Sequence, residues 1–289
     1  MGTNLAASRL PGHGSSLLRF VRRNPTFVLG AALLVVIVLS AVIAPLLVGD
    51  PITMYPSLRL APPGGRFPLG SDSFGRDVLA RTIFGARVSL TVGVSVAVIA
   101  IIIGLALGLI AGYVHVAGAP IMRVMDGLMA IPTMLLAIAL ISLTRASVST
   151  VIIAISIPEI PRVVRLVRSV VLTVRGQPFI EAAVAGGAQT PKIIMRHILP
   201  STLGPLIVQA SYVCASAILI EAALSFLGAG SPPEIPSWGN MIASSRLYLG
   251  RSPWTVFAPG IALALTVLAI NLVGDGLRDR LDPRLARRM

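Results

Sequence analysis

The chain has 289 residues, of which 55% are hydrophobic and 12% charged, and its mean hydropathy is +0.88. Soluble domains carry about 25% charged residues, so this composition excludes an ordinary soluble protein, and the apolar content excludes a disordered one. The net charge of +13 would suit nucleic acid, but aromatic residues make up 5%, too few for base-stacking surfaces. Lipid, and not nucleic acid, is the expected environment.

Six stretches are expected to cross the membrane, since a bilayer core of about 30 Å takes about 20 apolar residues in helix. In chain order they cover residues 27–48, 88–113, 121–143, 148–174, 203–224 and 254–273. The first is longer than the apolar core of a signal peptide, about 7–15 residues, and is expected to be retained. The fourth is the least regular, because Pro158, Glu159 and Pro161 follow its apolar run.

Small residues mark packing positions within these spans. Gly104, Gly108 and Gly112 recur every fourth residue, which places them on one helix face and predicts a close helix–helix contact. Cys214 is the sole cysteine, so no intrachain disulfide can form, and it is interpreted as a packing residue.

The segments between spans differ in character. Residues 49–67 are rich in Pro and Gly and predict an external loop, and residues 76–90 predict a short amphipathic helix at the outer interface. Residues 228–254 are too polar to span and predict a structured external loop. Sixteen basic residues lie on the side of the termini and eight on the other side, which favours cytoplasmic termini.

Motifs of common enzymes are missing. The sequence contains no Gly-x-x-x-x-Gly-Lys-Ser/Thr phosphate loop, no Gly-x-Ser-x-Gly elbow and no His-Glu-x-x-His pair. We therefore expect no catalytic residue, no metal site and no cofactor in this chain.

The segment between the fourth and fifth spans carries the strongest signal. Residues 178–200 predict two short helices separated by Gly186 and Gly187, with Glu181 in the first turn of the first helix, where the helix dipole favours an acid. Thr190 is the expected N-cap of the second helix and Pro191 its first residue. An amphipathic helix of this kind fits a protein partner or the membrane surface equally well.

This segment resembles the EAA motif of ABC-importer permeases, E-A-A-x-x-x-G followed by I-x-L-P. Glu181, Ala182, Ala183, Gly187, Leu199 and Pro200 match it, while His197 takes the isoleucine position, as in the H-I-L-P ending of the peptide/nickel branch.

Two further blocks resemble the same branch. Residues 68–81 (P-L-G-S-D-S-F-G-R-D-V-L-A-R) are similar to its block after the first span, and 224–228 (L-S-F-L-G) with 236–241 (P-S-W-G-N-M) to its block after the fifth. The order of the blocks and the single N-terminal span resemble the C-type subunit of oligopeptide or dipeptide importers.

The resemblance implies an all-α membrane protein with the type I ABC-importer permease fold, six transmembrane helices and both termini in the cytoplasm. It implies a cytoplasmic segment 1–26, a first helix with external loop and interfacial helix at 27–87, a five-helix core at 88–274 and a cytoplasmic tail 275–289. The core contains the EAA loop at about 176–200 and an external loop at about 226–253. The chain would lie in the bacterial inner membrane.

The implied partners are a second homologous permease, two ATPase subunits that bind ATP and Mg, and an extracytoplasmic substrate-binding protein. The resemblance implies that the loop couples to the ATPases through a set of matching residues: Glu181, Ala182, Ala183, Gly187, Thr190, Leu199 and Pro200. Candidates for the outer gate or the binding-protein contact are Asp72, Arg76, Asp77, Arg81, Trp238 and Asn240. Asp126 and Glu159 are candidates for lining the pathway, because charges near spans usually face an aqueous cavity.

Several alternatives stay open at this stage. Nickel chelates or glutathione-like solutes compete with oligopeptides and dipeptides as substrate. An ion-driven secondary transporter or a membrane scaffold would need no ATPase, although secondary carriers often show inverted repeats and polar residues at the membrane midplane. Few polar residues lie within the spans here.

Overall fold

The computed structural model describes residues 24–143, 147–232 and 234–281. Most of the predicted N-terminal segment 1–26 and the end of the tail 275–289 lie outside these ranges. Regular structure in the described part is helical, with two isolated β-bridges and no strand. Helices satisfy their own backbone hydrogen bonds, as segments in lipid must. The α-helices are α2 (Pro25–Leu47), α3 (Val78–Tyr113), α4 (His115–Ala130), α5 (Thr133–Ser142), α6 (Val148–Arg175), α7 (Pro178–Ala185), α8 (Thr190–Ile193), α9 (Leu199–Phe226), α10 (Trp238–Ser245) and α11 (Trp254–Leu281).

The described residues contain four helices that are long and apolar enough to cross a membrane, or five if one bent pair counts as a single span. The four are α2, α3, the helical run Thr190–Phe226 that contains α9, and α11. Their exposed surface carries many large apolar side chains, among them Val36, Val42 and Ile102. This surface suits hydrocarbon and not water.

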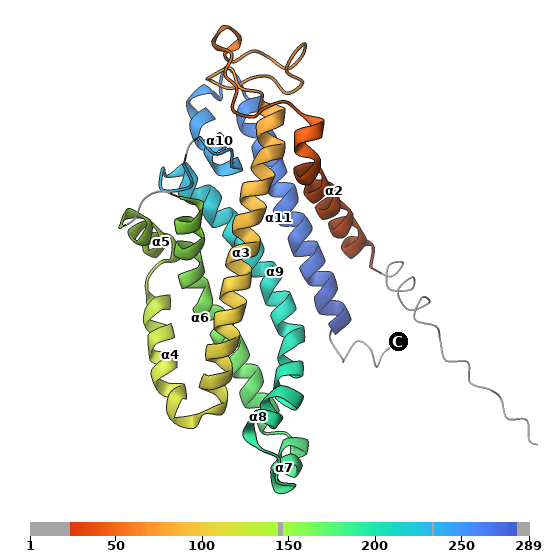
Figure 1. Cartoon of the computed structure of the whole chain (residues 1–289), viewed down its shortest axis with the longest axis vertical. Coiled ribbons are helices and arrows are strands. Elements are labelled where there is room, and N and C mark those ends of the chain that lie inside the picture. Colours follow the sequence, from red (N-terminus) through yellow and green to blue (C-terminus); the bar gives the residue numbers. More distant parts are fainter. Residues whose placement is uncertain (1–23, 144–146, 233, 282–289) are drawn as a thin grey trace, which may run out of the picture.

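Helix α3 is the centre of the bundle and contacts α2, α6, α9, α10 and α11 (Figure 1). It runs unbroken from Val78 to Tyr113, so the prediction of a separate short helix at residues 76–90 is wrong. The physical reason is local: Asp77 caps the helix by accepting a hydrogen bond from the Leu79 amide (2.8 Å), and nothing after it interrupts the turns.

The glycine face of α3 packs against α6, as the fourfold spacing predicts. A Cβ atom at Gly104, Gly108 or Gly112 would lie 2.5–2.6 Å from the Cβ atom of Val163, Val167 or Val171, respectively. Since real Cβ atoms do not come so close, glycine is required at each turn of this contact. The three valines are fully buried.

The predicted third span, residues 121–143, is not one straight helix. Helices α4 and α5 meet at an angle of 88° across Ile131 and Pro132. Pro132 disfavours helical geometry in the residue before it, and Ile131 is extended accordingly (φ −90°, ψ 128°). The fourth span, by contrast, continues as the single helix α6 through Pro158 and Pro161 to Arg175, as expected.

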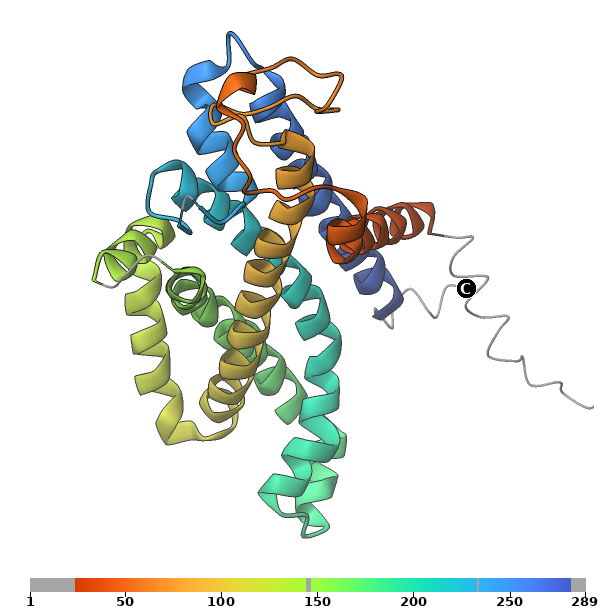
Figure 2. The same cartoon turned by 45° about the horizontal axis from the view of Figure 1, so that its top comes forward.

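The long helices connect two opposite ends of the molecule (Figures 1 and 2). Helix α10 and the loop from Val48 to Asp77 lie at one end, and α7 and α8 at the other. The described part of the loop 228–254, which the sequence predicts to be external, is structured as predicted, because it forms α10 and a 3-10 turn at Arg246–Tyr248.

Replacing Gly108 with Val should destabilise the bundle by about 1–3 kcal/mol, the usual cost of overpacking a tight contact. The midpoint of thermal unfolding of the purified chain in detergent measures this loss. Gly127→Ala on the exposed face of α4 is the matched control, because a Cβ there meets nothing within 4 Å. Equal midpoints for Gly108→Val and the control would show that the α3–α6 contact does not limit stability.

Candidate functional site

Helices α7 and α8 form a projection at the end of the molecule opposite α10 (Figure 1). Glu181, Ala182 and Val184 are exposed on α7, and Thr190 and Lys192 on α8. The first predicted short helix, α7, and the break after it are confirmed. The second is wrong as a separate short helix, because α8 begins a helical run that continues to Phe226. The surface that they present is mixed in polarity and carries charges of both signs.

The projection is anchored through its apolar side chains. Ile180 of α7, Ile193 of α8 and Ile198 are buried and belong to the core of the bundle. Phe179 packs near His197, with ring centroids 6.0 Å apart. Burial of one side of the projection leaves the side that carries Glu181 free.

Gly187 forms the turn between the two helices. Its φ of +77° is a left-handed conformation that L-residues adopt at a cost, whereas a Cβ there would meet open space. The amides of Gly187 and Ala188 donate to the carbonyls of Val184 (2.9 Å) and Ala183 (3.0 Å). This is the Schellman pattern, which closes the C-terminus of α7.

The start of α8 differs from the prediction by one residue. Gln189 is the N-cap, without a side-chain cap, and Thr190 is the first helical residue. The helix then continues through a π-helical turn, Ile194–Ile198, in which the Leu199 amide donates to the Ile194 carbonyl. Pro200 has no amide hydrogen, so it cannot donate the i→i−4 hydrogen bond of an α-helix. The backbone therefore takes the i→i−5 spacing of a π-helical turn before α9 begins.

At the other end, Asp72 organises the segment before α3 that the sequence predicts to be external. Its carboxylate accepts hydrogen bonds from the amides of Phe74 (2.8 Å) and Arg76 (2.9 Å) and pairs with the Arg76 guanidinium (2.7 Å). Arg81 lies 3.8 Å from the same carboxylate and donates to the Pro51 carbonyl (3.1 Å). The block of residues 68–81 thus folds upon itself.

Trp238 and Asn240 of α10 are also engaged inside the chain. Trp238 is 1% exposed and donates from its indole nitrogen to the Thr82 carbonyl of α3 (2.9 Å). The Asn240 amide donates to the carbonyls of Ser231 and Pro232, each at 3.0 Å. These side chains, like Asp72, Arg76 and Arg81, hold this end of the molecule together and present little surface of their own.

The two candidate pathway acids are each paired with an arginine of α6. Asp126 on α4 pairs with Arg165 (2.7 Å), and both side chains are more than half exposed. Glu159 is buried, pairs with Arg162 (3.0 Å) and accepts a hydrogen bond from Ser216 of α9 (3.3 Å). The structure does not bring the two acids into a common site.

Sequence reasoning missed the polar cluster around Glu221. Serines from three segments surround this buried carboxyl: Ser89, Ser225, Ser231 and Ser237. Glu221 accepts a hydrogen bond from Ser225 (2.9 Å). Ser225, Ser231 and Ser237 follow Glu221 closely in the sequence, but Ser89 belongs to the distant helix α3, so the full cluster had no sequence signal beyond the L-S-F-L-G and P-S-W-G-N-M blocks.

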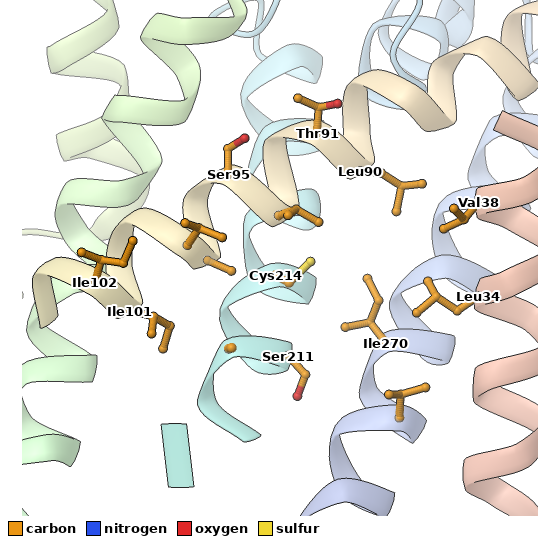
Figure 3. Close-up of a pocket in the computed structure, with 15 residues that line it drawn as sticks. Leu34, Val38, Leu90, Thr91, Ser95, Ile101, Ile102, Ser211, Cys214 and Ile270 are labelled. Carbon is orange, nitrogen blue, oxygen red and sulfur yellow. The ribbon is translucent and has the colours of Figure 1, made fainter. Parts of the chain in front are cut away.

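An apolar groove of about 820 Å³ lies between α2, α3, α9 and α11 (Figure 3). Its polar lining groups are the hydroxyls of Thr91, Ser95 and Ser211 and the thiol of Cys214. No charged residue of the described chain lines it, so the groove by itself offers no partner to the charged ends of a peptide. Within the described ranges, no group of three or more His, Cys, Asp or Glu residues could hold a metal ion.

Comparison with known proteins gives two family matches. Residues 100–287 match the model of the binding-protein-dependent transport system inner membrane component, and residues 16–63 match the N-terminal TM domain of oligopeptide transport permease C.

Curated relatives are similar over nearly the whole chain. The chain is 59% identical to the "Probable peptide ABC transporter permease protein" of Sinorhizobium fredii, over 94% of both chains. It is 41% identical to the dipeptide transport system permease protein of Escherichia coli K12, over 92% of this chain and 91% of the relative. An inward-facing structure of the MetNI methionine ABC transporter has a similar fold, with a TM-score of 0.60 at 20% identity, covering 71% of this chain and 97% of that one.

Replacing Gly187 with Ala should open the turn between α7 and α8, because the left-handed conformation costs a non-glycine residue about 1–2 kcal/mol. Hydrogen exchange at the backbone amides of position 187 and Ala188, which close this turn, should accelerate about five- to thirtyfold. Gly186→Ala is the control, since Gly186 has φ −76°. Unchanged exchange in Gly187→Ala would contradict the assigned turn.

Replacing Asp72 with Ala should destabilise the external segment by about 3–5 kcal/mol, because it leaves buried arginines without their counter-charge. Hydrogen exchange at the amides of Phe74 and Arg76, which donate to this carboxylate, reports the loss. Asp50→Ala removes an exposed carboxylate that bonds to its near neighbours Ile52 and Thr53 and should leave these amides protected. Equal protection in both variants would refute the role of Asp72.

Proposed function

The chain belongs to the family of binding-protein-dependent transport system inner membrane components and is the transmembrane permease subunit of an ABC importer, and we propose that it imports peptides and couples to ATPases through α7 and α8. It lies in the inner membrane, and ATP hydrolysis belongs to a separate subunit. An ion-driven carrier or a passive scaffold is thereby set aside.

The observation that carries the coupling proposal is the anchored projection at one end of the bundle. Ile180, Ile193 and Ile198 fix it to the core, while Glu181 and Ala182 stay exposed. A short helix held rigidly and presented beyond the long helices fits a groove on a partner protein. The membrane surface is the competing partner, because Phe179 and Val184 of α7 stay exposed beside the buried isoleucines.

Peptides are the proposed substrate class. The support is the naming of the relatives, which are described as peptide or dipeptide permeases and match along nearly the full chain. The apolar groove has no charged lining among the described residues, so the charged termini of a peptide need groups from elsewhere. We propose that a second permease completes the pathway and that an extracytoplasmic binding protein delivers the peptide. Nickel chelates and glutathione-like solutes are the competing substrates.

We infer six membrane crossings, with α4 and α5 forming one bent crossing and α6 another. Helix α6 has 28 residues and would extend about 42 Å at 1.5 Å per residue, enough to cross a bilayer core. The sixteen basic residues assigned to the side of the termini and of α7, against eight on the other side, support cytoplasmic termini. The external end is then the one that carries α10.

The external block takes a supporting part in this proposal. The surface that meets the binding protein is held in shape by Asp72, Arg76, Arg81, Trp238 and Asn240. Asp77 fixes the start of α3. Asp126 and Glu159 remain candidates for groups that face the pathway when the second permease is in place.

Affinity purification of the tagged chain from mild detergent, with mass spectrometry of its companions, tests the proposal. A second permease with ATPase subunits would support it, and an accompanying binding protein would narrow the substrate. Recovery of the chain without an ATPase, in a preparation that transports without ATP, would refute it.

Replacing Glu181 with Lys should lower transport-coupled ATP hydrolysis by at least about tenfold, because misplaced charge at an interface costs several kcal/mol. The chain should still insert and purify, since Glu181 is exposed. Glu234→Lys makes the same charge change at an exposed position near α10 and should preserve coupling. Normal coupling in Glu181→Lys would place the ATPase contact elsewhere.

A further inference from the structure

Helix α10 and the loop before it, residues 230–232 and 234–245, form an external cap over the ends of α3 and α9. The cap lies directly against both helices. A Cβ at Gly239 would lie 2.6 Å from the Ala222 Cα of α9, and a Cβ at Gly85 of α3 would lie 3.2 Å from the Trp238 ring. The cap therefore lies close to the backbones of α3 and α9. Polar groups that are buried in this contact need hydrogen-bond partners inside it.

Glu221 of α9 is the polar centre of this contact. Its side chain is 0% exposed, and its Oε1 accepts hydrogen bonds from Ser225 of α9 (2.9 Å) and from Ser231 of the cap (3.4 Å). Ser231 in turn contacts Ser237 (3.4 Å) and Asn240 (3.1 Å). One carboxyl thus links the outer end of α9 to both parts of the cap.

Two buried side-chain oxygens in the described part of the chain have no hydrogen-bond partner, namely Glu221 Oε2 and Ser89 Oγ. Ser89 belongs to α3, and its hydroxyl faces the same carboxyl. The ion pairs found among the described residues involve other acids. A buried carboxylate without a counter-charge is costly, whereas a neutral carboxyl can donate from Oε2 to Ser89 and leave neither atom unpaired.

We propose that Glu221, as a neutral carboxyl, is the positioning residue that fastens the external cap to α3 and α9. The helical run that carries it extends without interruption from Thr190 in the cytoplasmic projection to Phe226. A tilt of this run at its α8 end therefore moves Glu221, and the fastening carries that movement to the cap. The second part of the inference rests on the proposed function, because it assumes that α7 and α8 receive the ATPase.

The test uses the full transporter complex in lipid nanodiscs and proteoliposomes. Ser245→Cys, in a Cys214→Ser background, reports on the cap, because Ser245 ends α10 and is buried. Labelling by a membrane-impermeant maleimide should be at least about tenfold faster with Glu221→Ala, which leaves buried hydroxyls unpaired. Glu221→Gln should label slowly, because a neutral amide can still accept and donate.

Ser244→Ala is the matched control, since its hydroxyl bonds within α10, to the Met241 carbonyl (3.1 Å). If Glu221→Ala fails to purify as a monodisperse complex, Ser231→Ala serves as the second variant and should also label faster than the control. Slow labelling in the Ala variants, or fast labelling in Glu221→Gln, would overturn the fastening by a neutral carboxyl.

The amount of substrate transported per ATP hydrolysed distinguishes the fastening of the cap from the transmission of movement to it. Glu221→Ala should lower this ratio while ATPase subunits still co-purify, and Glu221→Gln should restore it. Fast labelling with an unchanged ratio would overturn the transmission of movement. Failure of the proposed function has a different signature, because the unmodified chain would then show neither ATPase subunits nor ATP-dependent transport.

Discussion

The close approach of α3 and α6 sets the geometry on which the other contacts depend. Gly104, Gly108 and Gly112 allow the two backbones to pack against the buried valines of α6 along three successive turns. In lipid, helices gain little from hiding apolar side chains from one another, so close packing and hydrogen bonds drive their association. Helix α3 packs against α6 on one face and contacts α2, α9 and α11 on its other faces. Near its start, the Thr82 carbonyl accepts the hydrogen bond of the Trp238 indole.

The helical run that contains α9 connects the two functional ends of the permease. Its inner part belongs to the projection, where the π-helical turn and Pro200 mark the change of register. Its outer part holds the cap through Glu221. The apolar groove between α2, α3, α9 and α11 lacks charged residues in the described part of the chain. Recognition of charged substrate groups is therefore left, in the proposed function, to an assembled pathway.

Most of the helices could be predicted from the sequence because their signals lie within a few neighbouring residues. Apolar length located α2, α3, α9 and α11, and the glycine pair before Ala188 located the turn after α7. The errors have local causes too. The amphipathic pattern of residues 76–90 suggested a separate helix, but Asp77 caps a helix that simply continues. Pro132 was visible within the third span, and it breaks the helix at Ile131, but the angle of 88° between α4 and α5 was seen only in the structure.

The sequence by itself determined that this chain lies in lipid, that it lacks the motifs of an ATPase, and that a break at Gly186 and Gly187 ends the short helix within residues 178–200. Hydropathy, motif content and helix signals depend on neighbouring residues in the chain, so they can be read without coordinates. Tertiary structure alone decided that Asp72, Arg81 and Trp238 are buried at the end that carries α10, and that serines from three segments meet Glu221. Burial and pairing of polar groups depend on residues that are distant in sequence, and only the folded chain brings them together.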